Sequence, residues 1–207
     1  MSDTKILQHL KTLYPEPKTE LHFTNAFQLA IAVLLSAQCT DKKVNEVTPA
    51  LFKAYPDFKS LATAAVVDIE RIIKQVNYYK TKSRHVVALG QIILKEYDGE
   101  LPRDHLILTT LPGIGRKTAN VICSELGIQP AFPVDTHVFR VAKRLHLAFG
   151  NTVRIVEQEL CDRFKPSLWR PLHHWLILHG RRVCKAQRPL CELCALTKVC
   201  PSAFKET

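Results

Sequence analysis

Hydrophobic residues recur along this chain at intervals of three and four positions. Ile6, Leu10 and Leu13 show this spacing near the N-terminus, and similar runs occupy residues 44–52 and 86–94. The spacing places apolar side chains on one face of an α-helix. The chain has no convincing run in which apolar and polar residues alternate, and no Asn-Gly or Asp-Gly pair that would mark a β-hairpin. The pattern therefore predicts an all-α protein.

The limits of these helices are predicted from residues that begin or end helices. Residues 27–37 are apolar nearly all round, which predicts a central helix rather than one on the surface. Small polar residues that favour the position before a helix predict three N-terminal caps. Glycines that follow or interrupt the helical patterns predict C-terminal ends. The expected N-caps are Asp41, Thr81 and Thr152, and the expected terminal glycines are Gly90, Gly99, Gly127, Gly150 and Gly180.

Composition restricts the class of protein and its partners. The 207 residues are 46% hydrophobic and 23% charged, which is ordinary for a globular protein and excludes a fibrous or disordered chain. The longest apolar stretch, residues 29–35, is far shorter than a membrane span. With no visible targeting or secretion signal, we expect a cytoplasmic protein without a membrane partner. The 29 Lys and Arg residues exceed the 19 Asp and Glu residues by 10, which favours an anionic polymer as partner.

A glycine-containing turn between two helical patterns is the first candidate site for binding such a partner. In the segment LPGIGRKTA, residues 111–119, Gly113 and Gly115 allow a tight turn to expose backbone N–H groups. A helix that begins near Gly115 adds its positive dipole end, so a nucleic-acid phosphate fits there. An ordinary turn between helices is the alternative. The spacing differs from that of a nucleotide-binding P-loop.

Lys117 and Asp135 are candidates for chemistry. A lysine in the first turn of a helix, beside Arg116, faces the positive end of the dipole, which favours the neutral and nucleophilic amine. The alternative is a lysine that contacts phosphate. Asp135 precedes another helical pattern near Arg140, and its simplest role is that of an N-cap. A carboxylate facing the lysine amine would also stabilise positive charge that develops on a substrate.

Four of the seven cysteines are clustered near the C-terminus. Cys184, Cys191, Cys194 and Cys200 have intervals of six, two and five residues between them. In a reducing compartment this cluster indicates a metal site rather than disulfides. Thiolates suit both tetrahedral zinc and a [4Fe–4S] cluster. The presence of one short Cys-x-x-Cys pair, where zinc modules usually have two, weakens the zinc alternative.

Taken together, these motifs resemble endonuclease III, the helix-hairpin-helix family of DNA glycosylase/lyases of base excision repair. The resemblance covers about residues 21–201 in the family's order, and the cysteine spacing matches the family's [4Fe–4S] loop. The resemblance rests on the segments LLSAQCTD at 34–41, LPGIGRKTAN at 111–120, VDTHVFRV at 134–141, HHWLILHG at 173–180 and the four cysteines.

The resemblance implies two helical domains with a DNA cleft between them. Residues 19–129 would form a six-helix bundle that contains the helix-hairpin-helix. Residues 1–18 and 130–207 would form a second helical domain that holds the [4Fe–4S] cluster. The partner would be double-stranded DNA with damaged pyrimidines or abasic sites, bound by a monomeric enzyme.

The resemblance also implies roles for individual residues. Lys117 would be the nucleophile that attacks C1′, releases the oxidised pyrimidine and forms a Schiff base, after which β-elimination cuts the strand. Asp135 would be the essential aspartate, and Gln38 would fill the gap left by the flipped base. Asn77 and Tyr78 stand where the family commonly has a glycine and a leucine, so Tyr78 would be the intercalating wedge. The expected DNA contacts are Gln38, Tyr78, Gly113, Gly115, Arg116 and Arg140.

Overall fold

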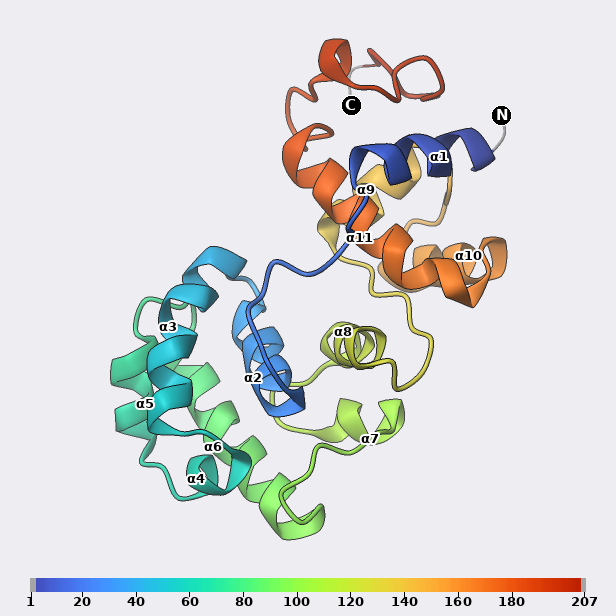
Figure 1. The fold of residues 1–207 in the computed structure, drawn as a ribbon. Coiled ribbons are helices and arrows are strands. Elements are labelled where there is room, and N and C mark those ends of the chain that lie inside the picture. The colour runs from blue at the N-terminus through green and yellow to red at the C-terminus, as the bar shows by residue number, and fades with distance from the viewer. Residues whose placement is uncertain (1–2, 206–207) are drawn as a thin grey trace. The chain divides into compact units, whose positions relative to one another are not determined.

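The protein is all-helical, as the hydrophobic spacing predicted. The structure is a computed structural model that describes residues 3–205. Within this range the regular elements are helices, with no β-strand, and no helix is long and apolar enough to cross a membrane. The chain divides into two compact units, one of residues 20–129 and one that combines the N-terminal part through Thr19 with the part from Pro130 onward (Figure 1). The predicted ranges also include residues 1–2 and 206–207, which lie outside the described residues.

Seven helices make up the unit of residues 20–129, where six were expected. The difference arises from short elements, since one of these helices has five residues and another has six. The helices are α2 (Ala26–Ser36), α3 (Asp41–Ala54), α4 (Phe58–Ala62), α5 (Val66–Ile73), α6 (Tyr79–Glu96), α7 (His105–Thr110) and α8 (Arg116–Leu126).

Helix α2 forms the centre of this unit. Every residue from Leu29 to Leu35 is buried, which confirms the central helix predicted from its apolar circumference. It contacts α3, α6 and α8, and Figure 1 shows it between α3 and α8. Each large aliphatic side chain buried here contributes about 2 kcal/mol of transfer free energy. A charged residue at Ile31 would therefore disrupt the unit.

Of the predicted helix ends, Gly150 is wrong because the preceding helix already ends at Arg144, six residues earlier. Two others are wrong because the glycines serve close packing. Gly90 lies inside α6, where an added Cβ would come within 2.9 Å of both the Ala62 nitrogen and the Leu61 Cβ. Gly180 lies inside α11 (Pro166–Arg182) and packs in the same way against α9 (Thr136–Arg144). Gly127, by contrast, ends α8 in the left-handed conformation, as predicted. A glycine at a helix–helix contact and one at a helix end look alike in sequence.

The predicted N-caps were correct at one position of three. Thr152 caps α10 (Val153–Arg163) by accepting a hydrogen bond from the Ile155 N–H. Thr40, rather than Asp41, caps α3, so the predicted cap is one residue late. Thr81 lies inside α6, which begins two residues earlier at Tyr79, after the left-handed Tyr78. No polar cap marks that start, and sequence preferences therefore placed it too late.

The second unit joins the two ends of the described chain. Helix α1 (Asp3–Leu13) packs on α11, and α9 packs on both α10 and α11. The Trp175 indole donates to the Tyr14 carbonyl at 2.9 Å, and Arg163 forms an ion pair with Asp3 at 2.7 Å. The first contact holds the end of the α1 segment against α11, and the second joins the start of α1 to the end of α10. Residues 183–205 follow α11 and contain no α-helix, only a single 3₁₀ turn at Cys191–Leu193.

Candidate functional site

The predicted hairpin lies between α7 and α8 in the unit of residues 20–129. The Ile114 N–H donates to the Leu111 carbonyl at 3.0 Å and closes a tight turn. Pro112 and Gly113 occupy its central positions, and the φ of +74° at Gly113 suits the second of these in a type II turn. A Cβ at Gly113 would also meet Leu34 at 2.8 Å. Both backbone conformation and packing therefore require glycine at this position.

Gly115 differs from Gly113 in what surrounds it. It is the N-cap residue of α8, its backbone is extended, and an added Cβ would meet nothing within 4 Å. Neither strain nor packing within the chain requires a glycine here. No side chain caps the first turn of α8, so the positive end of this helix dipole faces an open surface. This surface is suited to an anion that approaches the backbone closely.

Lys117 lies in the first turn of α8 and its side chain is exposed. Arg116 precedes it in the same turn and is exposed as well. The next three residues, Thr118 to Asn120, are buried and anchor the helix. The structure thus brings together Gly113, Gly115, Arg116 and Lys117 in one hairpin whose cationic side chains extend from a fixed helix end.

Asp135 is the N-cap of α9 in the other unit. Its Oδ1 accepts a hydrogen bond from the Val138 N–H at 2.8 Å, as expected for a cap, and the residue is half-buried. The neighbouring His137 has its pKa lowered mainly by burial, with the Asp135 carboxylate acting in the opposite direction. His137 is therefore predominantly neutral at neutral pH. The cap fixes the carboxylate at the start of the helix.

Arg140, one of the predicted DNA contacts, makes several bonds within its own unit. Its guanidinium donates to the Cys184 carbonyl at 3.1 Å and to the Gly180 carbonyl at 3.0 Å. Burial lowers its pKa, although the group remains charged. The visible role of Arg140 is to fasten the end of α11 and the first clustered cysteine to α9. A contact with DNA stays a prediction.

Gln38 and Tyr78 lie at two turns of the unit of residues 20–129. Both side chains are exposed, Tyr78 with 65% of its surface accessible. Both residues adopt the left-handed conformation, with φ of 52° at Gln38 and 59° at Tyr78. The Asn77 amide donates to the Gln38 carbonyl at 2.8 Å and joins the two turns directly.

Lys82 is a residue that the sequence analysis missed. Only 6% of it is exposed, and its ammonium donates to the carbonyls of Leu35 at 2.7 Å and Ala37 at 2.6 Å. Burial lowers its pKa. Its spacing of four residues from Val86 places it on the apolar face of α6. A lysine in line with an apolar stripe was the signal that would have identified it.

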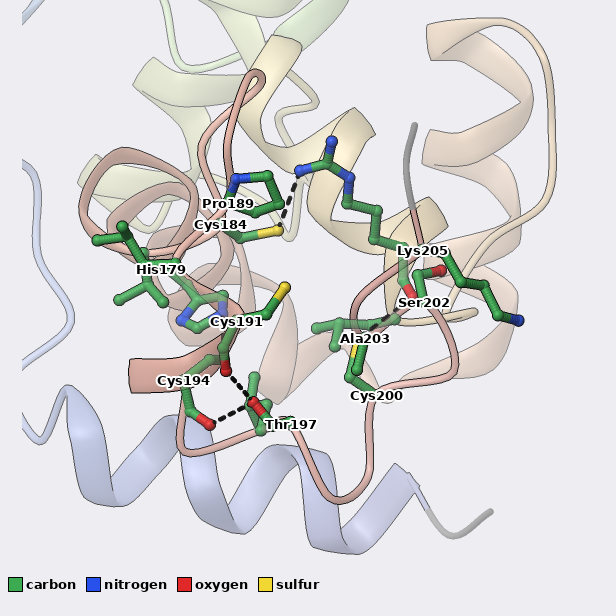
Figure 2. A pocket seen from close by; sticks show the side chains of 15 residues that line it. His179, Cys184, Pro189, Cys191, Cys194, Thr197, Cys200, Ser202, Ala203 and Lys205 are labelled. Carbon is green, nitrogen blue, oxygen red and sulfur yellow. Dashed lines mark hydrogen bonds between the residues drawn. The ribbon is translucent and has the colours of Figure 1, made fainter.

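The four clustered cysteines line one pocket in the second unit. Cys184, Cys191, Cys194 and Cys200 are half-buried free thiols, and Figure 2 shows them around the pocket with His179 and Thr197. The Thr197 hydroxyl donates to the carbonyls of Cys191 and Cys194, which shapes the loop between these cysteines. The predicted set is therefore gathered in one place.

Nearby donors and burial define the environment of these sulfur atoms. Arg144 approaches the Cys184 sulfur at 3.5 Å and also donates to the Lys185 carbonyl at 2.6 Å. The His179 Nε2 lies 3.6 Å from the Cys194 sulfur, and burial lowers the pKa of this histidine to about 4. Burial also raises the pKa of Cys194, and the nearby Cys184 and Cys191 add to this effect. Neighbouring thiolates in a partly buried pocket repel one another unless a cation compensates their charge.

Comparisons with known proteins agree with the resemblance found in the sequence. Residues 31–166 match the family described as HhH-GPD superfamily base excision DNA repair protein. Endonuclease III of Rickettsia felis is 42% identical over 196 residues, which cover 95% of this chain and 92% of that protein. Endonuclease III of Escherichia coli K12 is 39% identical over 196 residues, with 95% and 93% covered.

Solved structures give the same result for the fold. A non-covalent endonuclease III–DNA complex superimposes with a TM-score of 0.92 at 39% identity and covers 98% of this chain and 97% of its own. A trapped covalent endonuclease III–DNA intermediate gives a TM-score of 0.91 at the same identity and coverage. A thermostable thymine-DNA glycosylase, at 20% identity and a TM-score of 0.83, shares the fold. The chain therefore belongs to the endonuclease III family, within the HhH-GPD superfamily of base excision DNA repair proteins.

Proposed function

We propose that this protein is a DNA N-glycosylase with AP lyase activity that removes oxidised pyrimidines from duplex DNA, with Lys117 as the nucleophile. The observation that carries the proposal is the position of Lys117 on an exposed, uncapped helix N-terminus beside the hairpin, in a chain of this family. The hairpin supplies a surface for the DNA backbone next to a reactive amine.

The chemistry requires an amine rather than a hydroxyl or an activated water. The Lys117 nitrogen forms a bond to C1′ of the sugar while the bond from C1′ to the base breaks, and the base leaves with a proton. Opening of the sugar ring, in which O4′ takes up a proton from water, then converts the adduct to a protonated imine. Loss of a proton from C2′ expels the 3′ phosphate, which cuts the strand. A hydroxyl nucleophile would permit base release but not the imine that drives this elimination.

Asp135 is assigned to the charge that develops on the sugar. Its Oδ1 holds the N-cap hydrogen bond with Val138, and we assign the second carboxylate oxygen to the substrate. A fixed carboxylate stabilises the positive charge that builds up on C1′ as the base departs, without having to reorganise. Because Asp135 is positioned by the helix that it caps, its structural and chemical roles are compatible.

DNA binding is assigned to the hairpin and to the two left-handed turns. The exposed N–H groups at the start of α8, with Arg116 and the two hairpin glycines, suit phosphate oxygens. Gln38 and Tyr78 would enter the duplex where the flipped nucleotide leaves. The excess of 10 positive charges supports the same anionic partner. Arg140 would contribute from the second unit, in addition to its bonds with Gly180 and Cys184.

The four cysteines fit a [4Fe–4S] cluster. Their thiols line one pocket, and thiolates suit such a cluster. The intervals between the four cysteines match the [4Fe–4S] loop of the endonuclease III family, and this match favours the cluster over a single zinc ion. When bound, the cluster supplies a covalent staple that fixes residues 183–205. No step of base release depends on it.

Borohydride trapping tests the proposed function directly. The protein is mixed with duplex DNA that contains thymine glycol or an abasic site, and reduction converts the imine to a stable amine. We expect a covalent protein–DNA adduct that falls at least about a thousandfold in Lys117→Ala, because the nucleophile is lost.

The matched control is Lys59→Ala, which removes one exposed lysine from the same unit. It should form the adduct as the wild type does. A wild type that binds DNA but forms no adduct would be a non-catalytic DNA-binding protein. Release of the base without strand cleavage would indicate a monofunctional glycosylase, and adduct formation that survives Lys117→Ala would move the nucleophile elsewhere.

A further inference from the structure

Two exposed residues of this protein are held in a backbone conformation that side chains disfavour. Gln38 follows α2 and Tyr78 precedes α6, and both have φ values between 50° and 60°. A residue other than glycine loses about 1 kcal/mol or more in this conformation. Such positions persist only where surrounding contacts hold them. The contacts that hold these two therefore indicate what the arrangement is for.

The Asn77 side chain provides one of these contacts. Its Nδ2 donates to the Gln38 carbonyl at 2.8 Å, across 39 positions of sequence. Asn77 is exposed and directly precedes Tyr78. One hydrogen bond therefore links the backbone of Gln38 to the residue next to Tyr78. A residue without a side-chain donor, such as glycine, would leave the two turns unlinked here.

Lys82 fixes the same turn from the buried side. Its ammonium bonds the carbonyls of Leu35 and Ala37, which lie at the end of α2 and just before Gln38. A cation is favoured at the C-terminal end of a helix, where the carbonyl dipoles point outward. The Lys82 N–H also donates to the Tyr78 carbonyl at 3.0 Å, so this residue contacts both turns. With Lys82 below and Asn77 at the surface, Gln38 is restrained on two sides.

We propose that Asn77 is a positioning residue that makes Gln38 and Tyr78 enter the duplex as one rigid unit. This inference rests on the proposed function, which places both side chains in the DNA. A Gln38 amide whose backbone is fixed presents its donor and acceptor in one orientation to the base opposite the lesion. Rigid presentation favours one opposite base over another, because a mismatched donor or acceptor is left unpaired. Asn77 thereby influences opposite-base preference without touching the base itself.

The test uses a fluorescent base and a lesion analogue that does not react. Duplex DNA carries a tetrahydrofuran abasic analogue with 2-aminopurine opposite it, and this base fluoresces when it is unstacked. Wild-type protein at saturating concentration should raise the fluorescence. Asn77→Asp keeps the shape but sets a carboxylate against the Gln38 carbonyl, and Asn77→Gly removes the donor. In both variants we expect the insertion equilibrium to fall about fivefold, the factor set by one ordinary hydrogen bond.

Opposite-base preference gives a second readout. The ratio of base-release rates for thymine glycol opposite adenine and opposite guanine should move towards one in both Asn77 variants. Gln75→Ala, which removes an exposed amide two residues earlier, should retain the wild-type ratio and fluorescence. Thermal unfolding compares the stabilities of the variants and shows that each is folded.

The outcomes separate this inference from the proposed function. Wild-type fluorescence and an unchanged ratio in both Asn77 variants would overturn the positioning role while borohydride trapping of the wild type upholds the lyase. Failure of the wild type to form the covalent adduct would reject the lyase. The fluorescence experiment needs no reaction, so in that case it still decides whether Asn77 couples the two insertions.

Discussion

The two units of this protein are stabilised in different ways. The unit of residues 20–129 surrounds α2, in which the continuous run from Leu29 to Leu35 is buried. In the second unit, residues 183–205 contribute Leu196 as their only buried hydrophobic residue among those described. This segment is held instead by bonds from Arg140 and Arg144 to its backbone carbonyls. Apolar burial stabilises the first unit, whereas the end of the second has little apolar burial, and we propose that the [4Fe–4S] cluster fixes it.

This difference corresponds to the proposed division of labour. The proposed nucleophile Lys117 stands on a helix anchored by an apolar core, and such anchoring holds a reactive group in place. Residues 183–205 have little core of their own, so we expect the proposed cluster to order the cationic residues among them. Loss of a cysteine ligand should therefore affect residues 183–205 more than the helix that carries Lys117. The following predictions test this contrast.

The largest expected effect is on residues 183–205. Cys194→Ser removes one thiolate ligand, and we expect the purified protein to lose its iron and its visible absorbance, because an oxygen ligand is poorly suited to the cluster. Residues 183–205 should then become sensitive to limited proteolysis, measured by mass spectrometry of the fragments. Cys161→Ser, at a half-buried cysteine outside the cluster, should retain the iron. Full iron content and protease resistance in Cys194→Ser would contradict the staple.

A smaller effect is expected from a substitution in the second unit that removes the charge of Asp135 but keeps its helix cap. Asn and Asp are equivalent N-caps, so Asp135→Asn should keep α9 intact. It removes the negative charge that we assign to stabilising the positive charge on the sugar. We expect single-turnover base release to fall about a hundredfold or more, the scale of a lost electrostatic contact at a transition state. DNA affinity should remain close to that of the wild type.

Asp57→Asn is the matched control for Asp135→Asn. Asp57 caps α4 in the other unit through the Ser60 N–H at 2.7 Å, and no chemistry is assigned to it. This variant should release base at the wild-type rate. Equal rates in the two variants would reduce Asp135 to an N-cap.

The smallest expected effect is a difference between two helix caps in how their contribution to stability depends on pH. The backbone hydrogen bond from Ser60 lowers the pKa of Asp57 below its ordinary value of 3.8. The ionised cap therefore stabilises the fold above that ordinary value, and the contribution is lost as the pH falls through the lowered pKa. Asp57→Ala should cost about 1 kcal/mol at neutral pH, and its difference from the wild type should shrink below pH 3.8. Urea unfolding at several pH values measures this difference.

Thr152→Ala in the second unit is the counterpart of this experiment. The Thr152 hydroxyl caps α10 through the Ile155 N–H and does not titrate. Thr152→Ala should also lower the free energy of unfolding by about 1 kcal/mol, and this loss should stay constant over the same pH range. A cost that changes equally with pH for both caps would show that the effect does not come from the Asp57 carboxyl group.

Local patterns in the sequence were sufficient for the fold class and for the candidate residues. The apolar circumference of residues 27–37 identified the central helix, since a helix that is hydrophobic on all sides must be buried. Gly127 and Thr152 were recognised as helix ends because each acts on its own neighbouring backbone. The positions of Lys117, Asp135 and the four cysteines followed from motifs and their spacing. These features depend on residues close together in the chain.

The tertiary structure decided what depends on residues far apart. Gly90 is an internal packing contact because α4 and α6 approach each other closely there, and the sequence around it does not contain that information. Lys82 is buried because the end of α2 offers carbonyls to its ammonium, and Asn77 restrains Gln38 across 39 positions. A lysine or an asparagine has the same local preferences whether or not a distant carbonyl accepts its hydrogen bond. The sequence by itself therefore determined the helical fold class and the candidate chemistry, and only the folded chain determined which side chains hold that chemistry in place.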